Sequence, residues 1–254
     1  MNKINKTTKN RFDDLEITTI RLNRYISNAG ICSRRDADKL ILSGDITING
    51  KVVKELGMKV NFKDNVMYKG KKLNPERKVY ILLNKPKNCV TTSSDPQDRM
   101  TVIDLVKSAC EERIYPVGRL DRQTTGVLLL TNDGDLSKKL THPSSKIKKI
   151  YHIFTKEPVS IEHIKQIAQG INLTDGFIKA DEISYVDNDP YQIGIEIHSG
   201  KNRIVRRIFE HLGYQIEKLD RVYFAGLTKK TLSKGKWRYL TDKEVTFLKA
   251  GILR

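Results

Sequence analysis

The chain has 254 residues, which is enough for one large domain or for two smaller ones. Lys and Arg number 47 against 30 acidic residues, and the net charge of +17 indicates a polyanionic partner, with nucleic acid as the first candidate and simple solubility as the alternative. No apolar run approaches the length of a membrane span, and the three cysteines form neither a CxxC pair nor a disulfide framework. These observations argue against a membrane protein or a disulfide-stabilised secreted protein, and they favour a reducing cytoplasm.

The N-terminal part of the sequence predicts a polar tail followed by a compact unit. Residues 1–18 are polar, and we expect a disordered or loosely attached tail. Apolar residues at helical spacing predict a helix over 22–29, and Ser33 is a suitable N-cap for a second helix. Asn49-Gly50, between apolar residues, predicts a hairpin turn. The unit therefore has the order helix, helix, hairpin.

The basic residues of this unit lie on the predicted helix faces or at the hairpin. The six candidates for contact with phosphates are Arg21, Arg24, Arg34, Arg35, Lys39 and Lys51. Charge alone is equally consistent with a solvated basic surface. However, RLNRYISNAGICSRRDA at 21–37, continued by ITINGKVV at 46–53, closely resembles the S4 RNA-binding domain. The resemblance covers most of a predicted domain of residues 19–67, and it implies binding of structured RNA mainly through backbone and shape.

Residues 68–78 are basic and contain Gly and Pro, so we expect a linker to a second domain of residues 79–254. The elements predicted after the linker are, in chain order, a strand over 79–83, a short helix capped by Thr101, a buried strand over 127–130, a helix over 135–140, a strand over 148–153, a helix over 161–170, strands over 178–185 and 191–198, a helix over 203–212, a strand over 219–227 and a helix over 241–250.

Two stretches of the second part carry charges in unusual places. A polar loop bounded by Gly118 and Gly126 holds Asp121 between two arginines and runs directly into the buried strand. An ordinary turn aspartate is the alternative interpretation. Three arginines, Arg203, Arg206 and Arg207, occupy the start of a predicted helix, where cations oppose the helix dipole. They are expected to need a carboxylate or a phosphate nearby, or else to be exposed arginines of a basic protein.

Three separated segments of the second part are similar to the pseudouridine synthases of the S4-domain-containing RsuA and RluB/E/F type. GRLDRQTTGVLLLTNDG at 118–134 matches the catalytic-aspartate motif, KIY at 149–151 matches the segment with the base-stacking tyrosine, and GKNRIVRR at 200–207 with RVYFAGL at 221–227 matches the third motif. An S4-like domain placed in front is usual for this branch. Ile204 stands where family members often carry a polar residue, so no polar role is assigned there.

The resemblance implies an α+β fold. It consists of a small S4-like domain of two helices and a β-hairpin, followed by a catalytic domain with a mixed, mainly antiparallel sheet flanked by helices. It also implies that Asp121 is the catalytic carboxylate, that Tyr151 stacks on the uracil, and that Arg206 keeps Asp121 ionised, although a neighbouring arginine is an open alternative. The other residues assigned to the pocket or to RNA contact are Arg119, Arg122, Lys201, Arg203, Arg207 and Leu227.

The resemblance further implies site-specific conversion of uridine to pseudouridine in 23S (large-subunit) ribosomal RNA. The reaction has no redox step and no net group transfer, so no cofactor and no metal are expected. We expect a monomeric cytoplasmic enzyme whose partner is ribosomal RNA and which does not bind membranes. The alternatives are a 16S (small-subunit) rRNA pseudouridine synthase and a non-catalytic S4-type ribosome-assembly factor. A DNA-binding regulator is a weaker alternative, because a groove reader needs a recognition helix and usually a dimer.

Overall fold

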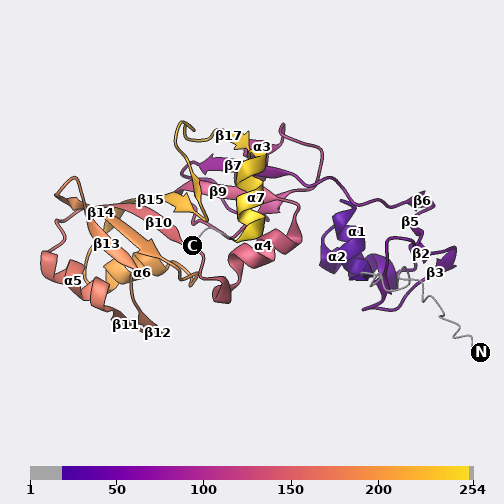
Figure 1. Ribbon diagram of the computed structural model, residues 1–254, viewed down its shortest axis with the longest axis horizontal. Coiled ribbons are helices and arrows are strands. Elements are labelled where there is room, and N and C mark those ends of the chain that lie inside the picture. Colours follow the sequence, from indigo (N-terminus) through magenta and orange to yellow (C-terminus); the bar gives the residue numbers. More distant parts are fainter. Residues whose placement is uncertain (1–18, 252–254) are drawn as a thin grey trace, which may run out of the picture. The chain divides into compact units, whose positions relative to one another are not determined.

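The computed structural model describes residues 19–251 and divides the chain into two compact units, Met1–Arg77 and Lys78–Arg254 (Figure 1). The predicted tail of residues 1–18 lies outside the described residues. Within the described part, no helix is both long enough and apolar enough to cross a membrane.

The first unit confirms the predicted order of helix, helix and hairpin. Helix α1 (Leu22–Asn28) is followed by α2 (Arg34–Leu42), and the Ser33 hydroxyl accepts a hydrogen bond from the Asp36 backbone N–H. Strands β2 (Ile46–Ile48) and β3 (Lys51–Val52) pair across Asn49-Gly50, where both residues have positive φ, as a type I′ turn requires. A separate ladder joins β1 (Ile20–Arg21) to β4 (Lys59–Val60).

The linker predicted at 68–78 does not begin at Tyr68. Strand β5 (Val66–Tyr68) pairs with β6 (Lys71–Lys72), and the four-stranded sheet has the order β3-β2-β5-β6. Leu73 is then buried in the core of the first unit. The turn between these strands is Lys69-Gly70, again with both φ values positive. The sequence did not indicate this hairpin, because lysine is not typical of the first position of such a turn and is depleted in strands.

The second unit is built on a mixed, mainly antiparallel sheet, as predicted. Its nine strands have the order β13-β14-β10-β15-β9-β7-β17, with β16 and β8 paired to β15 and β9. In the described chain, β15 and β9 form the only parallel pair of this sheet. The strands are β7 (Tyr80–Lys85), β8 (Tyr115–Pro116), β9 (Thr125–Thr131), β10 (Lys149–Thr155), β13 (Glu182–Val186), β14 (Asp189–Ile197), β15 (Ile216–Phe224), β16 (Leu227–Thr228) and β17 (Trp237–Tyr239).

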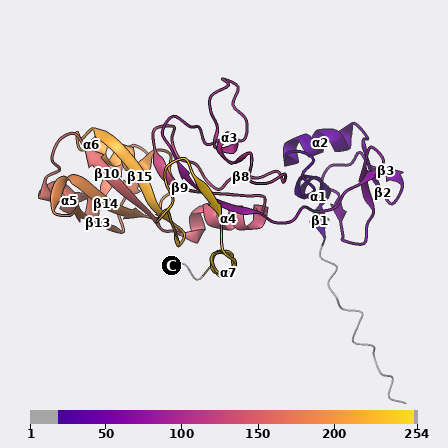
Figure 2. The same ribbon diagram turned by 90° about the horizontal axis from the view of Figure 1, so that it is seen from above.

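Helices cover both faces of this sheet (Figures 1 and 2). They are α3 (Val102–Val106), α4 (Gly134–Thr141), α5 (Ile161–Gln169), α6 (Ile204–His211) and α7 (Asp242–Ala250), with a short 3₁₀ turn at Pro143–Ser145. Around β7 and β9, α3 packs on one face while α4 and α7 pack on the other, so both strands are completely buried. Helices α5 and α6 pack with β10, β14 and β15 in a separate apolar cluster.

Several local features of this unit were not predicted, among them the short strands β8 and β17. Residues 171–178 form a hairpin of β11 (Ile171–Leu173) and β12 (Gly176–Ile178), each strand too short to show alternation in the sequence. The strand predicted over 219–227 is interrupted, because Ala225-Gly226 form a turn with positive φ and Leu227 begins β16.

Candidate active site

A cavity of about 890 Å³ opens beside the junction of β9, β10, β15 and the N-terminus of α6. Its walls come from segments far apart in the sequence. The structure brings together at this cavity most of the residues that the sequence assigned to the site, namely Arg119, Asp121, Arg122, Tyr151, Lys201, Arg203 and Arg206. Two assigned residues, Arg207 and Leu227, do not line it.

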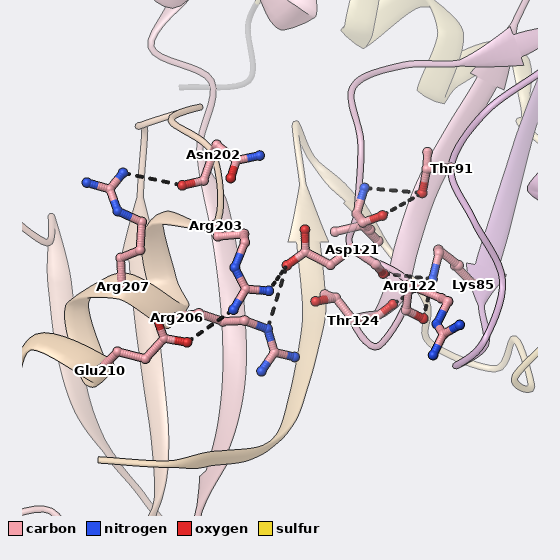
Figure 3. Close-up of polar contacts among 11 residues, drawn as sticks. Lys85, Thr91, Asp121, Arg122, Thr124, Asn202, Arg203, Arg206, Arg207 and Glu210 are labelled. Atoms are coloured by element: carbon pink, nitrogen blue, oxygen red, sulfur yellow. Dashed lines mark hydrogen bonds and ion pairs between the residues drawn. The ribbon is translucent and has the colours of Figure 1, made fainter. Parts of the chain in front are cut away.

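The loop that carries Asp121 is held by a lysine for which the sequence predicted no role. Lys85, at the end of β7, donates from Nζ to the backbone carbonyls of Asp121 (3.0 Å), Arg122 (3.3 Å) and Thr124 (2.9 Å), as Figure 3 shows. Nζ also lies 3.1 Å from the Pro86 carbonyl oxygen. An ammonium with several carbonyl acceptors is well solvated by the protein, so these bonds hold the loop in one conformation.

Lys85 is fully buried, and burial lowers the pKa of its ammonium from 10.5 to about 8. Nearby Asp121 and Cys89 act in the opposite direction and favour the charged form. The signal that could have revealed this residue is its position. A lysine that follows an apolar strand and Asn84, directly before Pro86, reaches solvent only if the strand ends at the surface.

Replacement of Lys85 by Met is expected to change how stability depends on pH. Between the folded pKa of about 8 and the ordinary value of 10.5, the unfolded chain binds this proton more tightly. The free energy of unfolding contributed by Lys85 therefore rises as pH increases through this window. We expect the difference between wild type and Lys85→Met to be more positive at pH 9.5 than at pH 7 by about 2 kcal/mol, measured by urea denaturation.

Lys87→Met, at an exposed lysine two residues away, is the matched control for loss of one positive charge. Suppose that the difference in free energy of unfolding between wild type and Lys85→Met fell as pH increased, while the difference for Lys87→Met did not. Burial would then not govern the pKa of the Lys85 ammonium.

The other end of the loop is set by a close approach of two strands. Gly126 has φ of +109°, and a Cβ at this position would lie 2.1 Å from the Arg221 carbonyl oxygen. Only glycine allows β9 and β15 to meet there in parallel. On the other side, the Thr91 hydroxyl donates to the Leu120 carbonyl oxygen at 2.7 Å. Asp121 is thus placed on a loop anchored at both of its ends.

Two arginines of the α6 N-terminus approach the same oxygen of Asp121 (Figure 3). Arg206 Nε lies 3.6 Å from Asp121 Oδ2, and Arg203 Nη1 lies 3.7 Å from it. Their side chains are 12% and 44% exposed, so Arg206 is the buried partner. Burial lowers the pKa of Arg206, with the nearby Arg203 charge in the same direction, while Asp121 opposes the shift. The prediction that these helix-start arginines need an anion is confirmed.

Arg203 also reaches Glu210 at 3.1 Å from Nη2 to Oε1. Its backbone adopts a left-handed conformation, with φ of +48°, at the position just before α6. Its side chain lines the cavity.

Arg207 points away from Asp121 and is paired elsewhere (Figure 3). It forms a bidentate pair with Asp175, in the turn between β11 and β12, and Lys201 Nζ donates to the Asp175 carbonyl oxygen at 2.8 Å. The Arg207 guanidinium lowers the pKa of Asp175 to about 2. Leu227 is 1% exposed and packs in the core that includes α4 and α7. Both residues therefore support the site from outside the cavity.

Tyr151 lies in the register position directly opposite Arg221 on the neighbouring strand. Arg221 is 2% exposed, and its Nε donates to the Val127 carbonyl oxygen at 2.8 Å. Lys149 also lines the cavity, and its Nζ donates to the carbonyl oxygens of Ile147 (2.9 Å) and His198 (2.8 Å). Burial, followed by the charge of Arg221, lowers the pKa of Lys149 to about 8. Lys149 and Arg221 belong to the motifs at 149–151 and 221–227, but the sequence did not predict a role for either residue.

In the first unit, five of the six basic residues assigned to phosphate contact are exposed, and Arg24 is half-buried. Lys39 is paired with Asp36 at 2.8 Å. Such an exposed pair is weak, so it does not commit Lys39 to Asp36.

Comparison with known proteins places this site in a family. The sequence model described as RNA pseudouridylate synthase matches residues 79–211, and the S4 domain model matches residues 20–66. The chain therefore belongs to the RNA pseudouridylate synthase family. It is accordingly an isomerase that acts on RNA, and it carries an N-terminal S4 domain.

Several relatives match nearly the whole chain. The chain is 41% identical to an uncharacterised RNA pseudouridine synthase of Aquifex aeolicus, with 90% of this chain and 93% of the relative covered. It is 40% identical to ribosomal large subunit pseudouridine synthase B of Bacillus subtilis (91% and 96% covered), and 35% identical to the dual-specificity RNA pseudouridine synthase RluF of Escherichia coli K12 (90% and 78% covered). A crystal structure of a pseudouridylate synthase aligns over 90% of this chain and 99% of its own, with a TM-score of 0.63 and 28% identity.

Proposed function

We propose that this enzyme converts a defined uridine of large-subunit ribosomal RNA to pseudouridine, with Asp121 as the catalytic carboxylate. The observation that carries the proposal is the position of Asp121. Asp121 lies on an anchored loop at the wall of a cavity of about 890 Å³, and Tyr151 lines the same cavity. The Oδ2 atom of Asp121 is 3.6 Å from Arg206 Nε. The large-subunit substrate is supported by the similarity to the Bacillus subtilis relative, whose name specifies the large ribosomal subunit.

The reaction asks for a rigidly placed carboxylate and a pocket for one base. The N1–C1′ bond of uridine breaks, the uracil turns, C5 bonds to C1′, the C5 proton leaves, and N1 takes up a proton. Asp121 acts as nucleophile or as electrostatic stabiliser in this glycosidic chemistry. Arg206 keeps the carboxylate ionised and oriented, and Tyr151 stacks on the uracil after it leaves the RNA helix.

The remaining charged residues of the cavity fit contact with an RNA backbone. Arg119, Arg122, Lys201 and Arg203 line the cavity without being buried, and we assign them to phosphates of the target strand. Arg207 and Leu227 are assigned as supports for this surface and for the pocket. The six basic residues of the S4 domain bind a structured region of the same RNA. We infer a monomeric enzyme, because Asp121 and both of its arginine partners come from one chain. We infer a cytoplasmic one, because its three cysteines form no disulfide with one another.

Mapping pseudouridines across both ribosomal RNAs, in cells with and without the gene, tests the proposed substrate. We expect one position, or two adjacent positions, of large-subunit rRNA to lose pseudouridine when the gene is deleted and to regain it with the wild-type gene. Loss in small-subunit rRNA alone would replace the proposed substrate by its nearest rival. Unchanged maps in both RNAs, combined with defective subunit assembly, would favour the non-catalytic alternative.

A further inference from the structure

Arg221 is a buried residue of the cavity lining, and no acidic side chain of the described residues pairs with its positive charge. Within residues 19–251, Arg221 contacts the Val127 carbonyl oxygen, the Tyr151 hydroxyl and the face of Phe224, whose ring centroid lies 4.6 Å from the guanidinium carbon. Its Nη2 is buried and has no hydrogen-bond partner in this part of the chain. The adjacent acid, Asp220, points instead to Thr125 and Lys229.

This arrangement is costly for folding alone. A buried guanidinium without a carboxylate loses much of its hydration and regains none of it from an ion pair. A second cation, Lys149, lies close enough for Arg221 to lower its pKa, while the charge of Asp181 acts in the opposite direction. Burial of Arg221 lowers the pKa of its own guanidinium too. Apolar residues would stabilise the fold better at such a position. Two cations at the wall of one cavity therefore point to negative charge that arrives with, or develops on, the occupant.

We propose that Arg221 is a positioning residue of the uracil pocket: it holds the hydroxyl of Tyr151 and supplies the fixed positive charge toward which negative charge on the detached uracil develops. This inference rests on the proposed function. Whether Asp121 acts at the sugar or at the base, an electron pair moves onto the uracil ring before C5 bonds to C1′. Cleavage of N1–C1′ leaves that pair on the base as an anion, and attack at the ring places it on the carbonyl system.

The experiment compares two variants on two substrates under single-turnover conditions. Arg221→Gln removes the charge, and Arg221→Lys keeps it, while both lose the guanidinium fork. One substrate is an RNA fragment that the wild type modifies, followed by C5-tritium release, and the other carries 5-fluorouridine at the target, followed by its loss from nuclease digests. The 5-fluorouracil anion is a weaker base than the uracil anion, so its formation needs less stabilisation.

We expect Arg221→Gln to slow reaction of uridine about 100-fold, and reaction of 5-fluorouridine about tenfold or less. Arg221→Lys is expected to slow uridine less than about tenfold, and both variants should bind RNA within about twofold of wild type in filter assays. Equal losses of Arg221→Gln on the two substrates, or an Arg221→Lys loss on uridine as large as that of Arg221→Gln, would mean that the charge of Arg221 does not act on the base, and either result would overturn the inference. If thermal melting shows that the Gln variant does not fold, Arg221→Met takes its place, because it also removes the charge but buries no unpaired polar group, and the same losses are expected on the two substrates.

Failure of this inference is distinguishable from failure of the proposed function. Pseudouridine formation by the wild type in a ribosomal RNA fragment tests the function. The ratio of rates between Arg221 variants tests the positioning role on whichever RNA the wild type modifies.

Discussion

Asp121→Asn is expected to abolish pseudouridine formation, with a loss of at least about 10³-fold in the rate of C5-tritium release. The amide has the size of the carboxylate but lacks the charge that either proposed mechanism needs. The fold should survive, because the loop is held through its backbone carbonyls by Lys85 and not through the Asp121 side chain. RNA affinity in a filter assay should therefore stay within about threefold of wild type.

Asp175→Asn is the matched control for this prediction. Asp175 also pairs with an arginine of α6, yet it lies outside the cavity lining. At saturating RNA we expect its tritium release to remain within about threefold of wild type. An Asp121→Asn variant as fast as Asp175→Asn would remove Asp121 from the chemistry.

The second large effect is expected from Arg206→Met. Arg206 is the more buried of the two arginines at Asp121, and its interaction with the carboxylate is screened less by water and salt. We expect tritium release to fall about 100-fold or more, while Arg203→Met, at the more exposed position, loses about tenfold or less. Loss of a buried, poorly hydrogen-bonded charge should leave thermal stability unchanged or raised.

The two single variants and their double variant, measured at low and high salt, separate the roles of these arginines. The loss of rate caused by Arg203→Met should become smaller as the salt concentration rises, because the side chains of Arg203 and Asp121 are both partly exposed. If Arg203→Met reduced the rate of tritium release as much as Arg206→Met or more, Arg203 would be the main partner of Asp121. The sequence left this alternative open.

Much of the fold follows from local signals in the sequence. The Ser33 and Thr101 caps and the Asn49-Gly50 turn depend only on neighbouring residues, and all three form as predicted. The all-apolar run of Val127–Leu130 predicts a strand buried on both faces, and β9 is such a strand. The hairpin at Lys69-Gly70 was not predicted, because its local pattern is weak. Lysines in both its strand and its turn are equally typical of an exposed linker.

The sequence by itself determined the two units, most of their helices and strands, and a motif-based choice of Asp121, Tyr151 and Arg206. Only the tertiary structure decided which charges meet. Lys85 and Asp121 are 36 positions apart, and Val127 and Arg221 are 94 apart. Arg221 pairs with Gly126 of β9 on one side and with Tyr151 of β10 on the other, and its side chain reaches the Tyr151 hydroxyl. Burial and pairing of a charge depend on which strands become neighbours, and that is settled by packing of the whole sheet rather than by local preference.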